Sequence, residues 1–171
     1  MNSLLVSAIS RTVGQHLPLL AALRETLQSP PECWLAEAND AAGAAQLAQA
    51  VADAGLLVIL TRVCRSSPGF LLRQFLNDLP SDGLRHKQVQ LVLLADGPSH
   101  LPGVAEGLQA ALSALGAAIV HPAIVFYGDT PVSQLQVKLT EIPPLFSRSH
   151  TGLPLVSPFS FLSSRLAIAA C

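Results

Sequence analysis

The stretch AGLLVILTRVCRSSPGFLLRQFLNDLP, residues 54–80, decides the fold. It contains the continuous apolar run 55–61, which is typical of a parallel strand that is covered on both faces. Polar residues, including Arg62 and Arg65, follow at once, and a stretch with helical spacing comes after them. Because open α/β sheets bind ligands just beyond the carboxyl ends of their strands, we expect a binding loop in residues 61–70.

Strands and helices alternate in both directions from this stretch. The spacing predicts strands at 3–9, 33–38, 55–61, 89–95 and 118–128, the last interrupted by Pro122, and helices at 17–28, 41–54, 71–80 and 104–117. This alternation predicts an α/β fold: a doubly wound, parallel, five-stranded sheet with helices on both faces. We expect one domain at 1–129, and a Pro- and Ser-rich arm or tail at 130–171.

The composition excludes several classes of protein. The chain has 171 residues, a net charge of −1 and only 12% charged residues, and its basic residues form no stripe with aromatic ones, so we expect no nucleic-acid partner. No apolar run approaches the ~18 residues of a membrane helix. The N-terminus lacks the basic and apolar regions of a signal peptide, so we expect a cytoplasmic protein.

The three cysteines predict neither a disulfide framework nor a metal site. They stand at 33, 64 and 171, far apart and without the spacing of metal ligands. Cys64 lies near two arginines, which can lower the pKa of a thiol, but a lone cysteine is most often a small buried residue. The apolar half of the composition favours a buried subunit interface.

Residues 53–117 resemble the NADPH-dependent FMN reductases of the flavodoxin-like fold, most closely the alkanesulfonate-associated two-component type. The family has a segment close to DGLIVATPVYKGSYSGLLKAFLDLLP, which aligns with the stretch quoted above, without a gap from Thr61 to Pro80. HLPGVAEGLQAALSALGA, starting at His100, is similar to the helix that follows the family's Thr-Gly-Gly loop. A weaker similarity extends over residues 3–129.

This resemblance implies a flavodoxin-like sheet and an NAD(P)H-dependent FMN reductase. Hydride would pass from the nicotinamide of NADPH, or of NADH, to FMN, and the reduced flavin would supply a flavin-dependent monooxygenase. The family also implies a homodimer or homotetramer. Because hydride passes directly between two cofactors, no catalytic side chain is required, and the protein's part is to position them.

The family's phosphate loop, GSPRxxSxT, corresponds here to residues 8–16. Arg11 is retained and Gln15 fits a polar site, whereas the leading Gly and Ser are lost and His16 replaces a hydroxyl. The resemblance implies that Arg11, Gln15 and His16 hold the phosphate at the start of a helix, where the helix dipole favours an anion. The alternative is an ordinary polar turn between a strand and a helix.

The loops that would face the flavin ring depart further from the family. Pro-Val-Tyr becomes Arg62-Val63-Cys64, and with Thr61 these residues are the predicted lining of the ring. Alternatively, Arg62 and Arg65 are solvated loop residues or make salt bridges at a subunit interface. Thr-Gly-Gly becomes Asp96-Gly97-Pro98; Gly97 would close the other side of the ring, while the carboxylate of Asp96 would oppose the negative charge of reduced flavin.

Two further hypotheses stay open because of these losses. One is a degenerate relative without flavin that acts as a structural or interaction subunit, paired through the apolar helix 71–79. The other is a module that binds a different anionic ligand through Arg11, Arg62 and Arg65. Flavin binding separates both from the reductase.

Overall fold

A computed structural model gives the structure of the chain. It describes residues 2–9, 17–28, 30–38, 40–64, 67–97, 101–128, 130–131, 134 and 138–139, without the side chains of 64, 67 and 102. No helix in these ranges is long and apolar enough to cross a membrane. Nor do the side chains in these ranges form a His, Cys, Asp or Glu group that could hold a metal ion.

Helices and strands alternate as the hydrophobic spacing predicts. The strands are β1 (Ser3–Ser7), β2 (Glu32–Trp34), β3 (Leu56–Cys64), β4 (Ser67–Pro68), β5 (Gln88–Ala95), β6 (Ala118–Ile119) and β7 (Ile124–Tyr127). The helices are α1 (Leu17–Thr26), the 3-10 turn η2 (Leu35–Glu37), α2 (Ala41–Asp53), α3 (Phe70–Asp78) and α4 (Leu101–Ala114).

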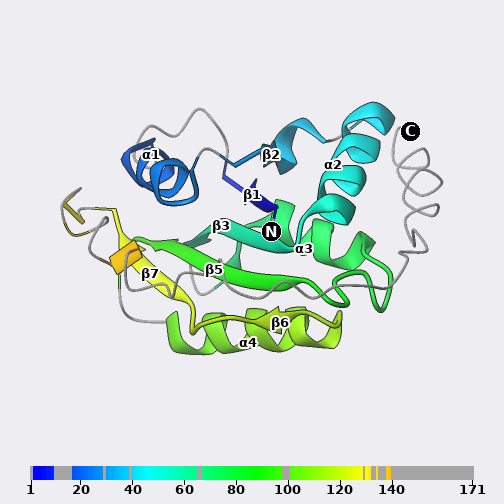
Figure 1. The fold of residues 1–171 in the computed structure, drawn as a ribbon. Coiled ribbons are helices and arrows are strands. Elements are labelled where there is room, and N and C mark those ends of the chain that lie inside the picture. The colour runs from blue at the N-terminus through cyan, green and yellow to red at the C-terminus, as the bar shows by residue number, and fades with distance from the viewer. Residues whose placement is uncertain are drawn as a thin grey trace.

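All strands of the described sheet except the short β4 run parallel to their neighbours. The spatial order is β2, β1, β3, β5 and then β6 and β7, which pair with successive parts of β5. The short β4 is antiparallel to the end of β3. Figure 1 shows the strands side by side through the middle of the molecule, with the helices outside. The predicted doubly wound parallel sheet is therefore confirmed.

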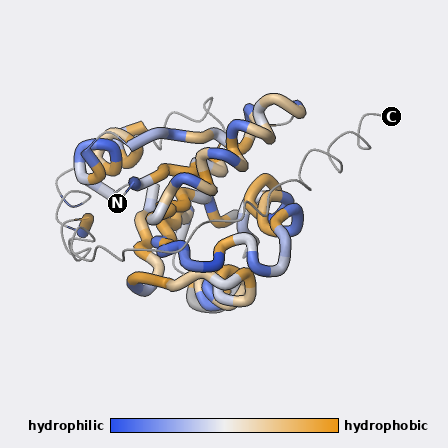
Figure 2. Tube along the Cα trace, turned by 45° about the vertical axis from the view of Figure 1, so that its right-hand side comes forward, coloured by the Kyte–Doolittle hydropathy of each residue, from blue (hydrophilic) through white to orange (hydrophobic). Residues whose placement is uncertain are grey.

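Two hydrophobic cores lie on opposite faces of the sheet. One contains the inner sides of α2, α3 and α4, and the other contains α1 together with Leu139, which is fully buried. Alternate residues of β3 belong to opposite cores: Leu57 and Ile59 to the first, Val58 and Leu60 to the second. In Figure 2 the helical parts of the tube carry both hydrophobic and hydrophilic residues, as helices that cover one face of a sheet do.

Several predicted boundaries are wrong. The strand predicted at 55–61 continues to Cys64, because Thr61 and Val63 are β-branched and their side chains are buried on one face of it. The helix predicted from 104 begins at Leu101, since a proline at 102 is tolerated in a first turn. Near Pro122 a bend divides the predicted strand 118–128 into β6 and β7.

Candidate functional site

The carboxyl ends of the central strands form the candidate site. From β1 the chain crosses to β2 on one side and then to β3 on the other, so the strand order reverses between β1 and β3. Ligands of open α/β sheets bind in the crevice outside the carboxyl ends at such a switch point. The ends that meet here are Ser7–Ile9, Thr61–Cys64 and Ala95–Gly97.

An ion pair joins the ends of β3 and β5. The Nη2 of Arg62 lies 2.6 Å from Oδ1 of Asp96. The Arg62 side chain is 30% exposed and that of Asp96 is 62% exposed. Arg62 thus lies in a strand rather than in the predicted loop, and its partner is within the same chain. The carboxylate that sequence reasoning set against a reduced flavin is therefore neutralised by a neighbouring guanidinium.

Thr61 and Val63 point to the opposite face of β3 from Arg62. Thr61 is fully buried, and its hydroxyl donates a 3.4 Å hydrogen bond to the carbonyl of Arg62. Val63 is 5% exposed and packs in the core under α3 and α4. In this structure the two side chains serve the core, so what they offer to a ligand is their backbone at the sheet edge.

The end of β3 is paired and not open. The short β4 runs antiparallel to it, with Val63 opposite Pro68, and α3 begins two residues after β4 ends. A Cβ atom added at Gly69 would lie 3.6 Å from the Thr61 hydroxyl and 3.7 Å from the Ala8 carbonyl oxygen. The start of α3 therefore packs over the ends of β1 and β3. This packing leaves less space for a ligand at this part of the sheet edge.

Gly97 leaves the edge open beside the ion pair. It follows Asp96 directly, and no atom of the residues that the structure describes lies within 4 Å of a Cβ added there. A flat ring can approach a backbone that has no side chain in the way. The structure thus leaves room at the predicted position of Gly97.

Ser7 and Tyr127 are polar residues at this edge that sequence reasoning missed. The Ser7 hydroxyl is fully buried and makes no hydrogen bond in the described part of the chain. Tyr127 ends β7 opposite Ala95 and is half-buried against the core. The available signals were a lone hydroxyl late in an apolar strand and the chain's single tyrosine at the end of another.

The predicted phosphate side of the site lies outside the described residues. Arg11, Gln15 and His16 belong to the segment that joins β1 to α1, and the side chain of Cys64 is likewise not described. Their roles stay predictions. What the structure fixes is that this segment starts at the end of β1, beside the end of β3.

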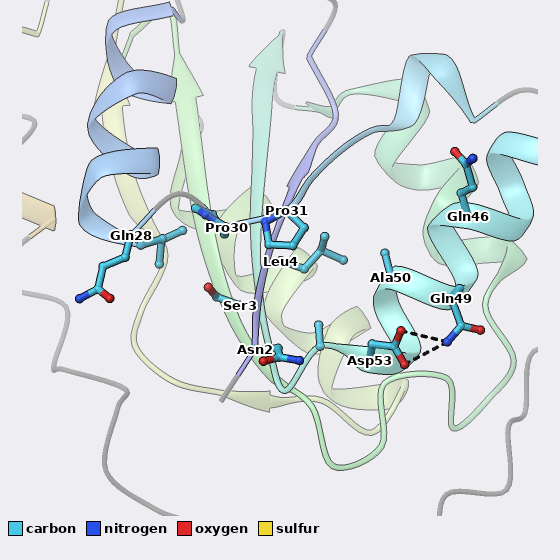
Figure 3. Close-up of a pocket in the computed structure, with 12 residues that line it drawn as sticks. Asn2, Ser3, Leu4, Gln28, Pro30, Pro31, Gln46, Gln49, Ala50 and Asp53 are labelled. Atoms are coloured by element: carbon cyan, nitrogen blue, oxygen red, sulfur yellow. Dashed lines mark hydrogen bonds between the residues drawn. The ribbon is translucent and has the colours of Figure 1, made fainter.

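A cleft of about 760 Å³ opens at the other edge of the sheet, between the ends of α1 and α2 and the start of β1 (Figure 3). Its polar lining consists mainly of amides, and both oxygens of Asp53 accept hydrogen bonds from the Gln49 amide. None of its described lining residues is Lys, Arg or His. The described lining of the cleft therefore offers no cationic side chain to a phosphate, and we place the candidate site at the carboxyl edge.

Comparisons with known proteins agree with this topology. No family model and no curated protein matches the sequence. Solved structures do match in shape. An apo NADH:FMN oxidoreductase superposes with a TM-score of 0.65 at 20% identity, over 83% of this chain and 88% of that one. The chain has a flavodoxin-like fold. The predicted resemblance to FMN reductases is thereby confirmed at the level of the fold.

Two further structures share the flavodoxin-like fold. An oxidoreductase from Corynebacterium diphtheriae has a TM-score of 0.66 at 17% identity, over 83% of this chain and 92% of its own. General stress protein 14 from Treponema denticola, solved in complex with FMN, has a TM-score of 0.64 at 13% identity, over 83% and 95%. This flavodoxin-like chain thus spans most of the length of each structure.

Proposed function

We propose that this protein is a flavin oxidoreductase that binds FMN at the carboxyl edge of its sheet. The observation that carries the proposal is the switch point between β1 and β3, with open backbone at Gly97 and a buried Ser7 hydroxyl that has no hydrogen-bond partner among the described residues. Structures of the same shape bear the names of FMN oxidoreductases or contain FMN. These features fit a ligand with a flat ring and a phosphate.

The finer proposal is an NAD(P)H-dependent FMN reductase. When bound, FMN supplies the hydride acceptor, and the nicotinamide of NADPH or NADH supplies the hydride. Arg11, Gln15 and His16 would hold the phosphate beside the end of β1. The backbone of Thr61, Val63 and Cys64 would border the ring on one side and Gly97 on the other, while the Arg62–Asp96 pair keeps this edge near neutral charge.

The remaining expectations extend the same proposal. Reduced flavin would pass to a monooxygenase, and the protein would act in the cytoplasm as a homodimer or homotetramer. Phe70, in the first turn of α3, is apolar and 68% exposed, and it would lie in the subunit contact if α3 forms that contact.

The rival function is a flavodoxin-like interaction subunit without flavin. The pairing of β4 with the end of β3 favours it, because Thr61 and Val63 lie in this part of β3 with buried side chains where the family has ring-facing residues. Arg62 is also engaged by Asp96. The two functions differ in a single property, the binding of FMN.

A titration of FMN with the purified protein tests the proposal. Saturable quenching of flavin fluorescence is expected, and Arg11→Ala is expected to weaken it strongly. Arg85→Ala is the matched control: this exposed arginine lies in the turn before β5, at the opposite edge, and its variant should bind FMN like wild type. Oxidation of NADPH and NADH in the presence of FMN then gives the activity and the nicotinamide preference. A well-folded protein that does not quench FMN overturns the proposal in favour of the interaction subunit.

A further inference from the structure

We propose that Arg62 is a cation shared between Asp96 and the phosphate of a bound nucleotide. Asp96 would thereby set how tightly the carboxyl edge binds that anion. The inference rests on the proposed function for the place of the ligand. The family has Pro and Thr at these two positions, so the resemblance implies no ion pair between them.

The position of Arg62 makes such sharing possible. β3 is the central strand, flanked by β1 on one side and β5 on the other. Arg62 projects from the same face as Leu60, which is paired in register with Ser7 of β1. A guanidinium at this point lies between the end of β1, where the predicted phosphate segment starts, and the end of β5. In this structure it contacts Asp96, on the β5 side.

The ion pair between Arg62 and Asp96 is weak enough for a phosphate to replace Asp96 as the partner of Arg62. Asp96 is largely exposed, at 62%, and ion pairs of this kind contribute little to stability and are screened by salt. A phosphate carries more charge than one carboxylate and matches the planar donors of arginine in two hydrogen bonds. A phosphate at the end of β1 therefore competes well with Asp96 for Arg62.

Ser7 provides a second polar group on the same side. Its hydroxyl is fully buried on the α1 face of the sheet and makes no hydrogen bond within the described ranges. Buried polar atoms without partners are rare in proteins, and each calls for an explanation. A ligand oxygen, or the Arg62 guanidinium turned toward β1, would give this hydroxyl a partner.

The competition with Asp96 can be measured by changing its charge. The dissociation constants of FMN and riboflavin, which lacks the phosphate, are compared for wild type, Asp96→Asn, Arg62→Gln and the double variant. Asp96→Asn is expected to bind FMN about two- to fivefold more tightly, the gain expected when an exposed ion pair no longer competes. Its affinity for riboflavin should not change. Arg62→Gln should weaken FMN binding, and adding Asp96→Asn to it should restore nothing.

A matched control measures the effect of the change in net charge alone. Asp82 is an exposed aspartate at the other edge, loosely paired with Arg85 at 3.8 Å. Asp82→Asn makes the same change in charge and should leave both dissociation constants as in wild type. Circular dichroism and melting temperature establish that each variant is folded. An equal gain for Asp96→Asn with and without Arg62 would show general repulsion by Asp96 and overturn the sharing.

A second probe separates this inference from the proposed function. Inorganic phosphate is added and the rise in melting temperature is measured for the same variants. A larger rise in Asp96→Asn than in wild type, absent in Arg62→Gln, supports the shared cation even if no flavin binds, and in that case only the reductase proposal fails. If FMN binds but Asp96→Asn leaves the ratio of FMN to riboflavin affinity unchanged, the shared cation fails and the reductase stands. If neither flavin nor phosphate has an effect, both fail.

Discussion

At the scale of single residues, Gly97 is a position where a substitution should change ligand binding without changing the fold. Its backbone is not in the left-handed region, and space surrounds the position of a Cβ atom. A Cβ atom there meets no atom of the described residues within 4 Å, and a larger side chain would occupy the volume that a flavin ring would need. Few positions at the carboxyl edge allow the site to be blocked with so little effect on the fold.

Gly97→Leu is therefore expected to fold normally and to lose FMN. The free energy of unfolding in urea should stay within about 0.5 kcal/mol of wild type, as for most surface substitutions. The dissociation constant of FMN should rise by about tenfold or more, the loss of roughly 1.4 kcal/mol of binding free energy. Gly107→Leu is the control, because Gly107 also has open space around it but lies within α4. Unchanged FMN binding in Gly97→Leu would place the ligand elsewhere.

Lys87 is a buried cation with a structural role. It is 8% exposed, and its Nζ donates hydrogen bonds to the carbonyls of Ala52 and Ala54. These carbonyls lie at the end of α2, where the last turn has no partners within the helix. Lys87, which precedes β5, thus ties the end of α2 to the start of the neighbouring strand.

Lys87→Met is expected to destabilise the protein by about 1–3 kcal/mol, because it leaves buried carbonyls without donors. Urea unfolding at neutral pH measures the loss. Arg85→Ala, in the same turn but 65% exposed in its side chain, should change stability by less than about 0.5 kcal/mol. An equal effect of the two variants would contradict the role assigned to Lys87.

The pH dependence of stability tests the same residue. Burial lowers the pKa of Lys87, and the nearby charge of Asp53 offsets this in part. The unfolded chain then holds the proton more tightly than the folded chain. The free energy of unfolding should rise with pH from the lowered folded value up to the ordinary lysine pKa of about 10.4, after subtraction of the same curve for Lys87→Met. A difference that falls with pH in this window would show the opposite shift.

At the scale of elements, α2 owes its start to a capping side chain. Asp40 has an extended backbone, and its carboxylate accepts a 2.7 Å hydrogen bond from the backbone N–H of Gly43. A carboxylate here also faces the positive end of the helix dipole. No basic residue stands in the last turn of this helix, so its other end depends on Lys87.

Asp40→Ala is expected to cost about 1 kcal/mol of stability, the usual loss when a capping acceptor is removed. Asp40→Ser keeps an acceptor and should retain most of the stability. Both are measured by urea unfolding, with amide hydrogen exchange of residues 41–44 as the local readout. Faster exchange confined to Asp40→Ala supports the cap, and equal losses in the two variants would contradict it.

Most helices and strands could be predicted, because their buried residues recur at the regular spacing of a helix or a strand. The apolar runs of β3 and β5 and the amphipathic helices α2 and α4 come from local periodicity alone. The pairing of β4 with the end of β3 could not be predicted, because two residues are too few to show a hydrophobic spacing of their own. For the same reason the three-residue 3-10 turn after β2 was expected as strand.

At the scale of the whole molecule, the topology positions the site. The alternation of strands and helices predicts a parallel sheet, and the spatial order then brings the ends of β1, β3 and β5 together. The Arg62–Asp96 pair spans 34 positions in sequence, so only the register of β3 against β5 reveals it. Sequence reasoning identified both residues and the edge they share, but not that they neutralise each other.

Hydrogen exchange measured by mass spectrometry, with and without FMN, tests the central claim most directly. The account predicts slower exchange at the carboxyl edge, in peptides covering residues 8–16, 61–70 and 95–101. It predicts no change in residues 27–31 and 46–53, which line the cleft at the opposite edge (Figure 3). Protection confined to that cleft, or no protection anywhere at saturating FMN, would contradict a flavin site at the carboxyl edge.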